Sequence, residues 1–240
     1  MPVSSSRSPS SHTPLREREA EMERLTFETA DGLRLEGEIR QPDRATRGSA
    51  VICHPHPLKG GSKDHPLLWA IRIALVRRGF AVLSFNFRGV MGSQGSFGEG
   101  LMEVRDTLAA IDRIRREAEG PTLVVGWSFG ASVALRSSLE DDRVKAAALV
   151  ALPLDAAPKD VPPIPPVEEL ERFERPVLLL VGDADPYCPV PELRRIGARL
   201  PKGVVTIFKG ADHYFGGRER DAAEAVGGFA ERALFQGRAG

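Results

Sequence analysis

The amino-acid sequence predicts an α/β protein built on one doubly wound, mostly parallel β-sheet that begins with an antiparallel hairpin. Three observations indicate this fold class. Continuous apolar runs of strand length recur along the chain, as is typical of strands covered on both faces. Amphipathic stretches with helical spacing separate most of these runs. An alternating pattern of apolar and polar residues precedes them and is typical of a hairpin with one wet face.

The N-terminal segment differs in composition from the rest of the chain. Residues 1–24 are rich in Ser, Pro and Arg, which predicts a disordered tail. The tail lacks the apolar region of a secretory signal, and Glu19, Glu21 and Glu23 argue against a transit peptide, so we expect a cytoplasmic protein. Residues 25–240 are expected to form a single domain, because strands and helices alternate along them.

The predicted elements of this domain follow in chain order. Residues 25–29 and 33–39 alternate apolar and polar side chains around Ala30-Asp31-Gly32, a sequence typical of a hairpin turn. Buried strands are predicted at 50–53, 81–85, 122–125, 147–150, 177–181 and 204–207. Helices are predicted at 67–78, 101–118, 129–139, 192–200 and 221–234. Such an alternation implies right-handed crossovers between neighbouring strands.

A proline-rich segment interrupts the alternation. Residues 153–166 contain six prolines, which neither donate hydrogen bonds to a sheet nor continue a helix. We therefore expect residues 153–175 to form either an extended connection or a short cap over a pocket, and the sequence leaves both interpretations open.

The composition excludes several classes of function. The chain has 33 Lys and Arg residues and 33 Asp and Glu residues, so its net charge gives no electrostatic reason to bind nucleic acid. Its longest apolar runs are far shorter than the roughly 20 residues that cross a membrane. Two cysteines without a CxxC spacing do not support a metal site. His54, His56 and His65 do not support one either, since alternate residues of an extended segment point to opposite sides.

One pentapeptide has the features of a nucleophile turn. Gly126-Trp127-Ser128-Phe129-Gly130 follows a buried strand and opens a helix, which is the context expected of a G-x-S-x-G sequence. A serine on such a tight turn needs small neighbours, and the following helix directs its N-terminal dipole at developing negative charge. Ser128 is therefore the predicted nucleophile.

A serine nucleophile needs a base and an acid that orients the base. In this arrangement the chain order is serine, acid, histidine, and His213 is the only histidine after Ser128. The acid is expected after the penultimate strand, where Asp183 and Asp185 are both available. Asp185 is preferred because it lies farther beyond the strand end, whereas Asp183 could brace the turn.

An oxyanion hole requires two backbone N–H groups. Phe129, directly after the nucleophile, is expected to supply one. In the loop after the strand at 50–53, Pro55 and Pro57 are excluded because proline has no N–H group. Residues 56–60 line up with an H-G-x-x-G pattern in which the residue after the second position donates, so Leu58 is the first choice for the second donor and His56 the alternative. Trp127 is expected to line the substrate pocket, with core packing as an equally acceptable role.

Three linked motifs resemble those of a known family. They are an HPHPxxGG loop at 54–61, an N-F-R-G-V stretch with G-S-x-G at 86–95 and a G-W-S-F-G-A turn at 126–131. With them the chain resembles the α/β-hydrolase superfamily, and more closely its small bacterial serine hydrolases with a minimal lid or none. The resemblance spans residues 25–234. It implies that Ser128 is the nucleophile, His213 the general base and Asp185 the orienting acid.

The second of these motifs departs from the family pattern at one position. Met91 stands where the family usually has a small residue, so the loop around it is expected to sit differently. We therefore assign Arg88 no substrate role and expect it to brace loops as a buried arginine.

These residues predict a serine hydrolase that cleaves carboxylic esters or thioesters of small acyl groups through an acyl-enzyme intermediate. Small substrates are expected because the proline-rich segment is too short to enclose a long acyl chain. The reaction requires no metal or organic cofactor, and the expected partner is a small-molecule ester or thioester. An amidase or peptidase with the same triad, and a catalytically silent binding protein, are the alternatives. The oligomeric state is left open.

Overall fold

The computed structural model describes residues 22–154 and 160–236, and within them it has the predicted fold class. An eight-stranded sheet has the order β1-β2-β4-β3-β5-β6-β7-β8. The β1–β2 and β2–β4 pairs are antiparallel, and all the other pairs are parallel. The strands are Met22–Glu28 (β1), Arg34–Arg40 (β2), Gly48–Cys53 (β3), Phe80–Phe85 (β4), Thr122–Trp127 (β5), Val144–Val150 (β6), Val177–Gly182 (β7) and Gly203–Phe208 (β8).

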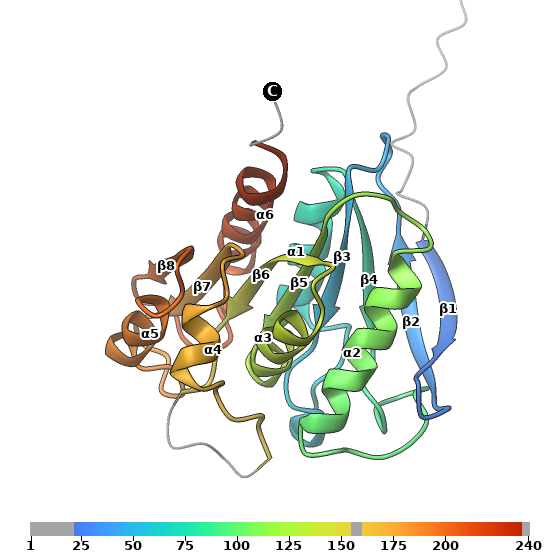
Figure 1. The fold of residues 1–240 in the computed structure, drawn as a ribbon, viewed down its shortest axis with the longest axis horizontal. Coiled ribbons are helices and arrows are strands. Elements are labelled where there is room, and N and C mark those ends of the chain that lie inside the picture. The colour runs from blue at the N-terminus through green and yellow to red at the C-terminus, as the bar shows by residue number, and fades with distance from the viewer. Residues whose placement is uncertain (1–21, 155–159, 237–240) are drawn as a thin grey trace, which may run out of the picture.

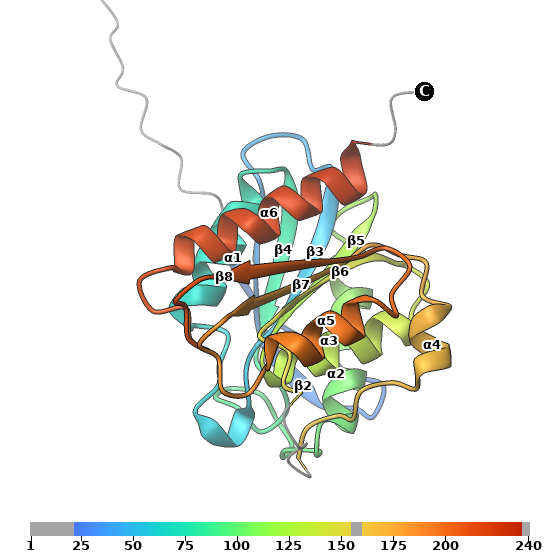
Figure 2. The same ribbon diagram turned by 90° about the vertical axis from the view of Figure 1, so that its left-hand side faces the viewer.

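Helices cover both faces of this sheet (Figures 1 and 2). Helices α1 and α6 pack together on one face, and α2, α3 and α5 lie on the other. The helices are Pro66–Val76 (α1), Leu101–Ile114 (α2), Phe129–Glu140 (α3), Val167–Glu171 (α4), Val190–Gly197 (α5) and Glu219–Phe235 (α6), and a 3₁₀ turn, η1, spans Pro57–Lys59. In the described part of the chain, none of these helices is long and apolar enough to cross a membrane.

The continuous apolar runs are explained by a core on each side of the sheet. In β5, the side chains of Leu123 and Val125 join the core beneath α1 and α6, whereas Val124 joins the core beneath α2 and α3. Because successive side chains of a strand point to opposite faces, a strand covered on both faces reads as a nearly continuous apolar run. This is why β3, β4, β5 and β7 are buried along their full lengths.

Several boundaries differ from the predicted ones. Strand β1 begins at Met22, so residues 22–24 belong to the sheet and not to the predicted tail. Their side chains are exposed, so no apolar alternation marks them, but their backbone pairs with β2. Helix α2 ends at Ile114, four residues before the predicted end. The rest of the predicted tail, residues 1–21, lies outside the described residues.

The proline-rich segment is fastened to the domain. Residues 153–154 and 160–166 form neither helix nor strand, residues 155–159 lie outside the described part, and the short helix α4 follows. Both Nε and Nη2 of Arg136, on α3, donate to the carbonyl oxygen of Pro163, at 3.0 and 2.9 Å. The connection is thereby held against the helix that begins directly after Ser128.

Candidate active site

Ser128 lies on a strained turn between β5 and α3. Its backbone has φ 56° and ψ −124°, in the left-handed region that a residue with a side chain seldom adopts. The two flanking glycines permit this turn. A Cβ atom at Gly126 would overlap the carbonyl oxygen of Gly130, and one at Gly130 would overlap the carbonyl oxygen of Cys53. The strain is therefore built into a site where the Ser128 hydroxyl is presented at the carboxyl end of the sheet.

His213 lies between Ser128 and Asp185, and its two ring nitrogens face different partners. Nε2 is 2.9 Å from the Oγ atom of Ser128, and Nδ1 is 2.8 Å from the Oδ2 atom of Asp185. A carboxylate can only accept, so Nδ1 carries the proton and Nε2 is free to accept one from the hydroxyl. The sequence-predicted nucleophile, base and acid are thus brought into one hydrogen-bonded chain.

Asp185 lies in the loop after β7 and is held by burial and by a hydrogen bond to the backbone. The side chain of Asp185 is fully buried, and its second oxygen, Oδ1, accepts a hydrogen bond from the backbone N–H of Tyr187 at 2.8 Å. Asp183, the alternative acid, accepts from the backbone N–H of Gly210 at 2.6 Å and braces the loop after β8. No contact between Asp183 and His213 occurs in the described structure.

The predicted oxyanion donor Leu58 is not available for that role. Its N–H donates to Nδ1 of His56 at 3.2 Å, and its side chain is exposed away from the cavity beside Ser128. The N–H of His56, the alternative donor, has no partner within residues 22–154 and 160–236. Phe129 is the first residue of α3, so its N–H has no partner in the helix. Of the N–H groups considered from the sequence, those of Phe129 and His56 are therefore the ones without a partner in the described residues.

A cavity of about 150 Å³ opens beside Ser128. Its walls include His56, Trp127, Val161, Tyr187 and His213. Trp127 has both of the roles considered from the sequence, because its ring packs in the core beneath α1 and α6 and also reaches the cavity. Its Nε1–H donates to the carbonyl oxygen of His213 at 3.1 Å, which ties the histidine loop to strand β5.

The loop between β3 and α1 contains three histidines, and each of them makes a hydrogen bond to the backbone. His54 donates from Nδ1 to the carbonyl oxygen of Pro55 at 2.6 Å and accepts at Nε2 from the N–H of Phe87 at 3.0 Å. Its complete burial lowers its pKa to about 4. His65 accepts from the N–H of Leu67 at the start of α1. Within the described residues, no group of three His, Cys, Asp or Glu side chains could hold a metal ion.

The two cysteines are buried and reduced. Burial raises the pKa of the Cys53 thiol to about 12 and that of Cys188 still further. Neither thiol lines the cavity. We therefore assign no reactive role to either one.

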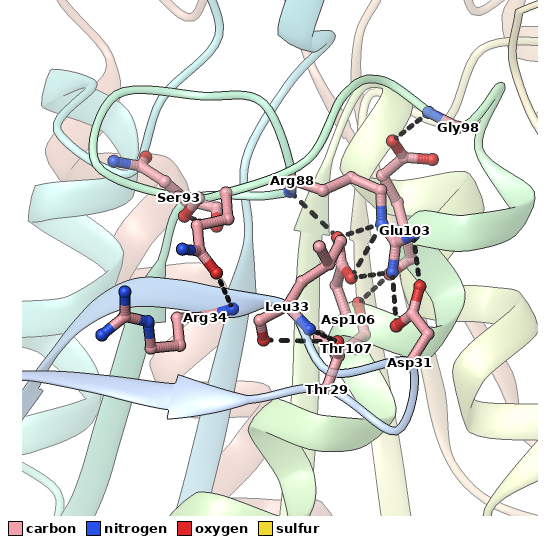
Figure 3. A network of polar contacts seen from close by, with 12 residues as sticks. Thr29, Asp31, Leu33, Arg34, Arg88, Ser93, Gly98, Glu103, Asp106 and Thr107 are labelled. Atoms are coloured by element: carbon pink, nitrogen blue, oxygen red, sulfur yellow. Dashed lines mark hydrogen bonds and ion pairs between the residues drawn. The ribbon is translucent and has the colours of Figure 1, made fainter.

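Arg88 braces two loops, as expected from the sequence (Figure 3). Its Nε atom lies 3.0 Å from the fully buried carboxylate of Asp106, and its Nη1 atom lies 3.0 Å from Asp31 in the β1–β2 turn. The hydrogen bond to Arg88 lowers the pKa of Asp31 to about 2. Phe97, in the braced loop, lies 5.8 Å from the ring of Phe129. Arg88 thus supports Phe129, the residue next to Ser128, through Phe97, and it does not line the cavity.

Comparisons with known proteins agree with this architecture. An uncharacterized protein of Rickettsia prowazekii (strain Madrid E) is 28% identical over 221 residues, which cover 85% of this chain and 87% of that protein. A lidless a/b serine hydrolase from Xanthomonas campestris is 27% identical, with a TM-score of 0.75 over 90% of this chain and 96% of that one. An alpha-beta serine hydrolase homologue from Coxiella burnetii is 26% identical, with a TM-score of 0.75 over 85% and 95%. Residues 46–233 match the family described as alpha/beta hydrolase domain, and the chain therefore belongs to that family.

Proposed function

We propose that this protein is a serine hydrolase that cleaves carboxylic esters or thioesters of small acyl groups through an acyl-enzyme intermediate. The observation that carries the proposal is the hydrogen-bonded chain from Ser128 through His213 to Asp185 beside a cavity. The similarity to a lidless serine hydrolase and to a serine hydrolase homologue, each more than four-fifths covered by the alignment, supports the same reaction class.

In the acylation step, the Oγ atom of Ser128 attacks the carbonyl carbon while Nε2 of His213 takes its proton. Asp185 stabilises the imidazolium that forms. The developing oxyanion accepts hydrogen bonds from the N–H groups of Phe129 and His56, two residues that line the cavity. His213 then gives its proton to the leaving alcohol or thiol, and the acyl group stays on Ser128.

In the deacylation step, water attacks the acyl carbon and gives a proton to Nε2 of His213. Collapse of the second tetrahedral intermediate releases the carboxylic acid and returns the proton to Ser128. The nucleophile, the base and the oxyanion donors all belong to the chain, so no step calls for a metal or an organic cofactor.

The size of the cavity supports small acyl groups. A volume of about 150 Å³ is smaller than that of most ligand sites and suits a group of roughly benzene size. The aromatic and apolar wall from Trp127, Val161 and Tyr187 favours an uncharged acyl chain.

A fluorophosphonate probe and a chain-length series test the proposal. The probe should label the native protein and not Ser128→Ala. Nitrophenyl esters and acyl thioesters of two to six carbons should be hydrolysed faster than longer ones, and faster than the matching amides. A folded native protein that neither reacts with the probe nor turns over any of these substrates would instead be a binding protein of this fold.

A further inference from the structure

The side chain of His56 makes a second histidine–aspartate pair, separate from that of the triad. Its Nε2 atom is 2.9 Å from the Oδ2 atom of Asp160, and its Nδ1 atom accepts the N–H of Leu58 at 3.2 Å. The imidazole is 7% exposed and the Asp160 side chain is 36% exposed. The two residues lie 104 positions apart in the chain, so this contact joins the loop between β3 and α1 to the proline-rich connection.

The two contacts assign the protonation of the ring. A backbone N–H can only donate, so Nδ1 of His56 must be unprotonated and the ring proton must lie on Nε2. The carboxylate of Asp160 accepts that proton. It therefore selects one tautomer, as Asp185 does for His213, although with the roles of the two ring nitrogens exchanged.

The loop that contains His56 is wound around this residue. The carbonyl oxygen of His56 accepts hydrogen bonds from the N–H groups of Lys59 and Gly61, both at 3.0 Å. The imidazole lies 5.1 Å from the ring of Phe97 and 5.0 Å from that of Phe129. The orientation of the His56 backbone, and with it the direction of its N–H, is therefore set together with the orientation of its ring.

We propose that Asp160 is a positioning residue for the oxyanion hole. Its carboxylate holds the Nε2-protonated ring of His56, and the ring holds the loop whose His56 N–H faces the reacting carbonyl oxygen. The segment that carries Asp160 is suited to this role, because Arg136 binds Pro163 and because Val161 lines the cavity. This inference rests on the proposed function, since it assigns His56 N–H a share in stabilising the oxyanion.

The test compares Asp160→Ala with Glu169→Ala, which removes a negative charge from the exposed side of the nearby helix α4. With a short-chain nitrophenyl ester, Asp160→Ala should lower kcat by about 10- to 100-fold with little change in KM, because oxyanion donors act on the transition state. Asp160→Asn keeps an acceptor for the Nε2 proton, so it should restore kcat to within about threefold of the native value.

A second readout separates positioning from a general loss of structure. A short-chain trifluoromethyl ketone forms a tetrahedral adduct on a serine, whereas the product acid does not. Asp160→Ala should weaken the binding of the ketone by the same factor by which it lowers kcat/KM, and it should leave the affinity for the product acid unchanged. Equal kcat values for Asp160→Ala and Glu169→Ala, in an enzyme that depends on Ser128, would overturn the inference and leave the proposed function standing.

The protonation of His56 can be read in the native chain even if Asp160→Ala fails to fold. Nitrogen-15 NMR should show a protonated Nε2 and a bare Nδ1 on His56. A proton on Nδ1 would overturn the inference. An absence of turnover and of fluorophosphonate labelling in the folded native protein would instead overturn the proposed function.

Discussion

Replacement of Asp185 by asparagine tests the triad with almost no change in shape. The N–H of Tyr187 donates to Oδ1 of Asp185, so an asparagine here must place its carbonyl oxygen at that position. Its NH₂ group then takes the place of Oδ2, 2.8 Å from Nδ1 of His213. Two donors cannot face each other, so Nδ1 loses its proton and Nε2 gains one. A protonated Nε2 cannot accept the proton of Ser128.

The expected loss of kcat follows from the free energy needed to restore the active tautomer of His213, with its proton on Nδ1. To recover it, the amide must turn over and leave the partly buried N–H of Tyr187 without its acceptor, at about 1–3 kcal/mol. The charge-assisted bond that stabilises the imidazolium is also lost, at about 1.5–3 kcal/mol. The sum is roughly 2.5–6 kcal/mol. At about 1.4 kcal/mol for each factor of ten, kcat should fall by about 10²- to 10⁴-fold.

The assay is the steady-state hydrolysis of a short-chain nitrophenyl ester, with circular dichroism to establish that the variant is folded. Asp183→Asn is the matched control, because it makes the same chemical change two residues away, where the amide oxygen can still accept from Gly210. The control should retain kcat to within about threefold. A folded Asp185→Asn variant with more than a tenth of native kcat would refute the reasoning, and so would an equal loss in the control.

Three further predictions concern stability and reactivity. Asp106→Ala leaves the buried guanidinium of Arg88 with only Asp31, its partly exposed partner, and should lower the free energy of unfolding in urea by about 3–5 kcal/mol. Asp31→Ala should lower it by less than about 1 kcal/mol, and equal losses would contradict the difference in burial between the two carboxylates. His54 binds its proton more weakly when folded, so the unfolded chain takes up more protons between its unfolded pKa near 6.5 and its folded pKa of about 4. Stability should therefore be complete above the upper value and fall by about 3 kcal/mol as the pH drops to the lower one, with a shallower fall in His54→Asn. Neither cysteine thiol should react with iodoacetamide until the protein is unfolded, and rapid labelling of the native chain would contradict their burial.

Most of the fold and the set of Ser128, Asp185 and His213 could be predicted because they depend on strong, local signals. Strand β5 is buried at every position and mostly apolar, and a Cβ atom at Gly126 or Gly130 would overlap backbone atoms of the turn. The order of serine, acid and histidine then selects His213 from five histidines. Asp185 could be preferred over Asp183 because distance beyond a strand end is a property of sequence position.

The pair of His56 and Asp160 could not be predicted in this way. The two residues are brought together by the path of an extended connection, and prolines restrict that path without determining its direction. Asp160 has no partner at helical or hairpin spacing that would single it out. Likewise, a fully buried position for Asp106 opposite Arg88 depends on how α2 packs, which the periodicity of the helix leaves undetermined.

Leu58, in contrast, was wrong for a reason that can be read from the sequence. The tripeptide His-Pro-Leu occurs twice, at 56–58 and at 65–67. In both places proline is the first residue of a helical turn, the histidine before it is the N-cap, and its Nδ1 atom accepts the N–H of the leucine. In both His-Pro-Leu turns, the N–H of the residue after the proline is thus already bonded to the side chain of the capping histidine. The free donor in such a loop is the N–H of the cap residue itself, which at this site belongs to His56.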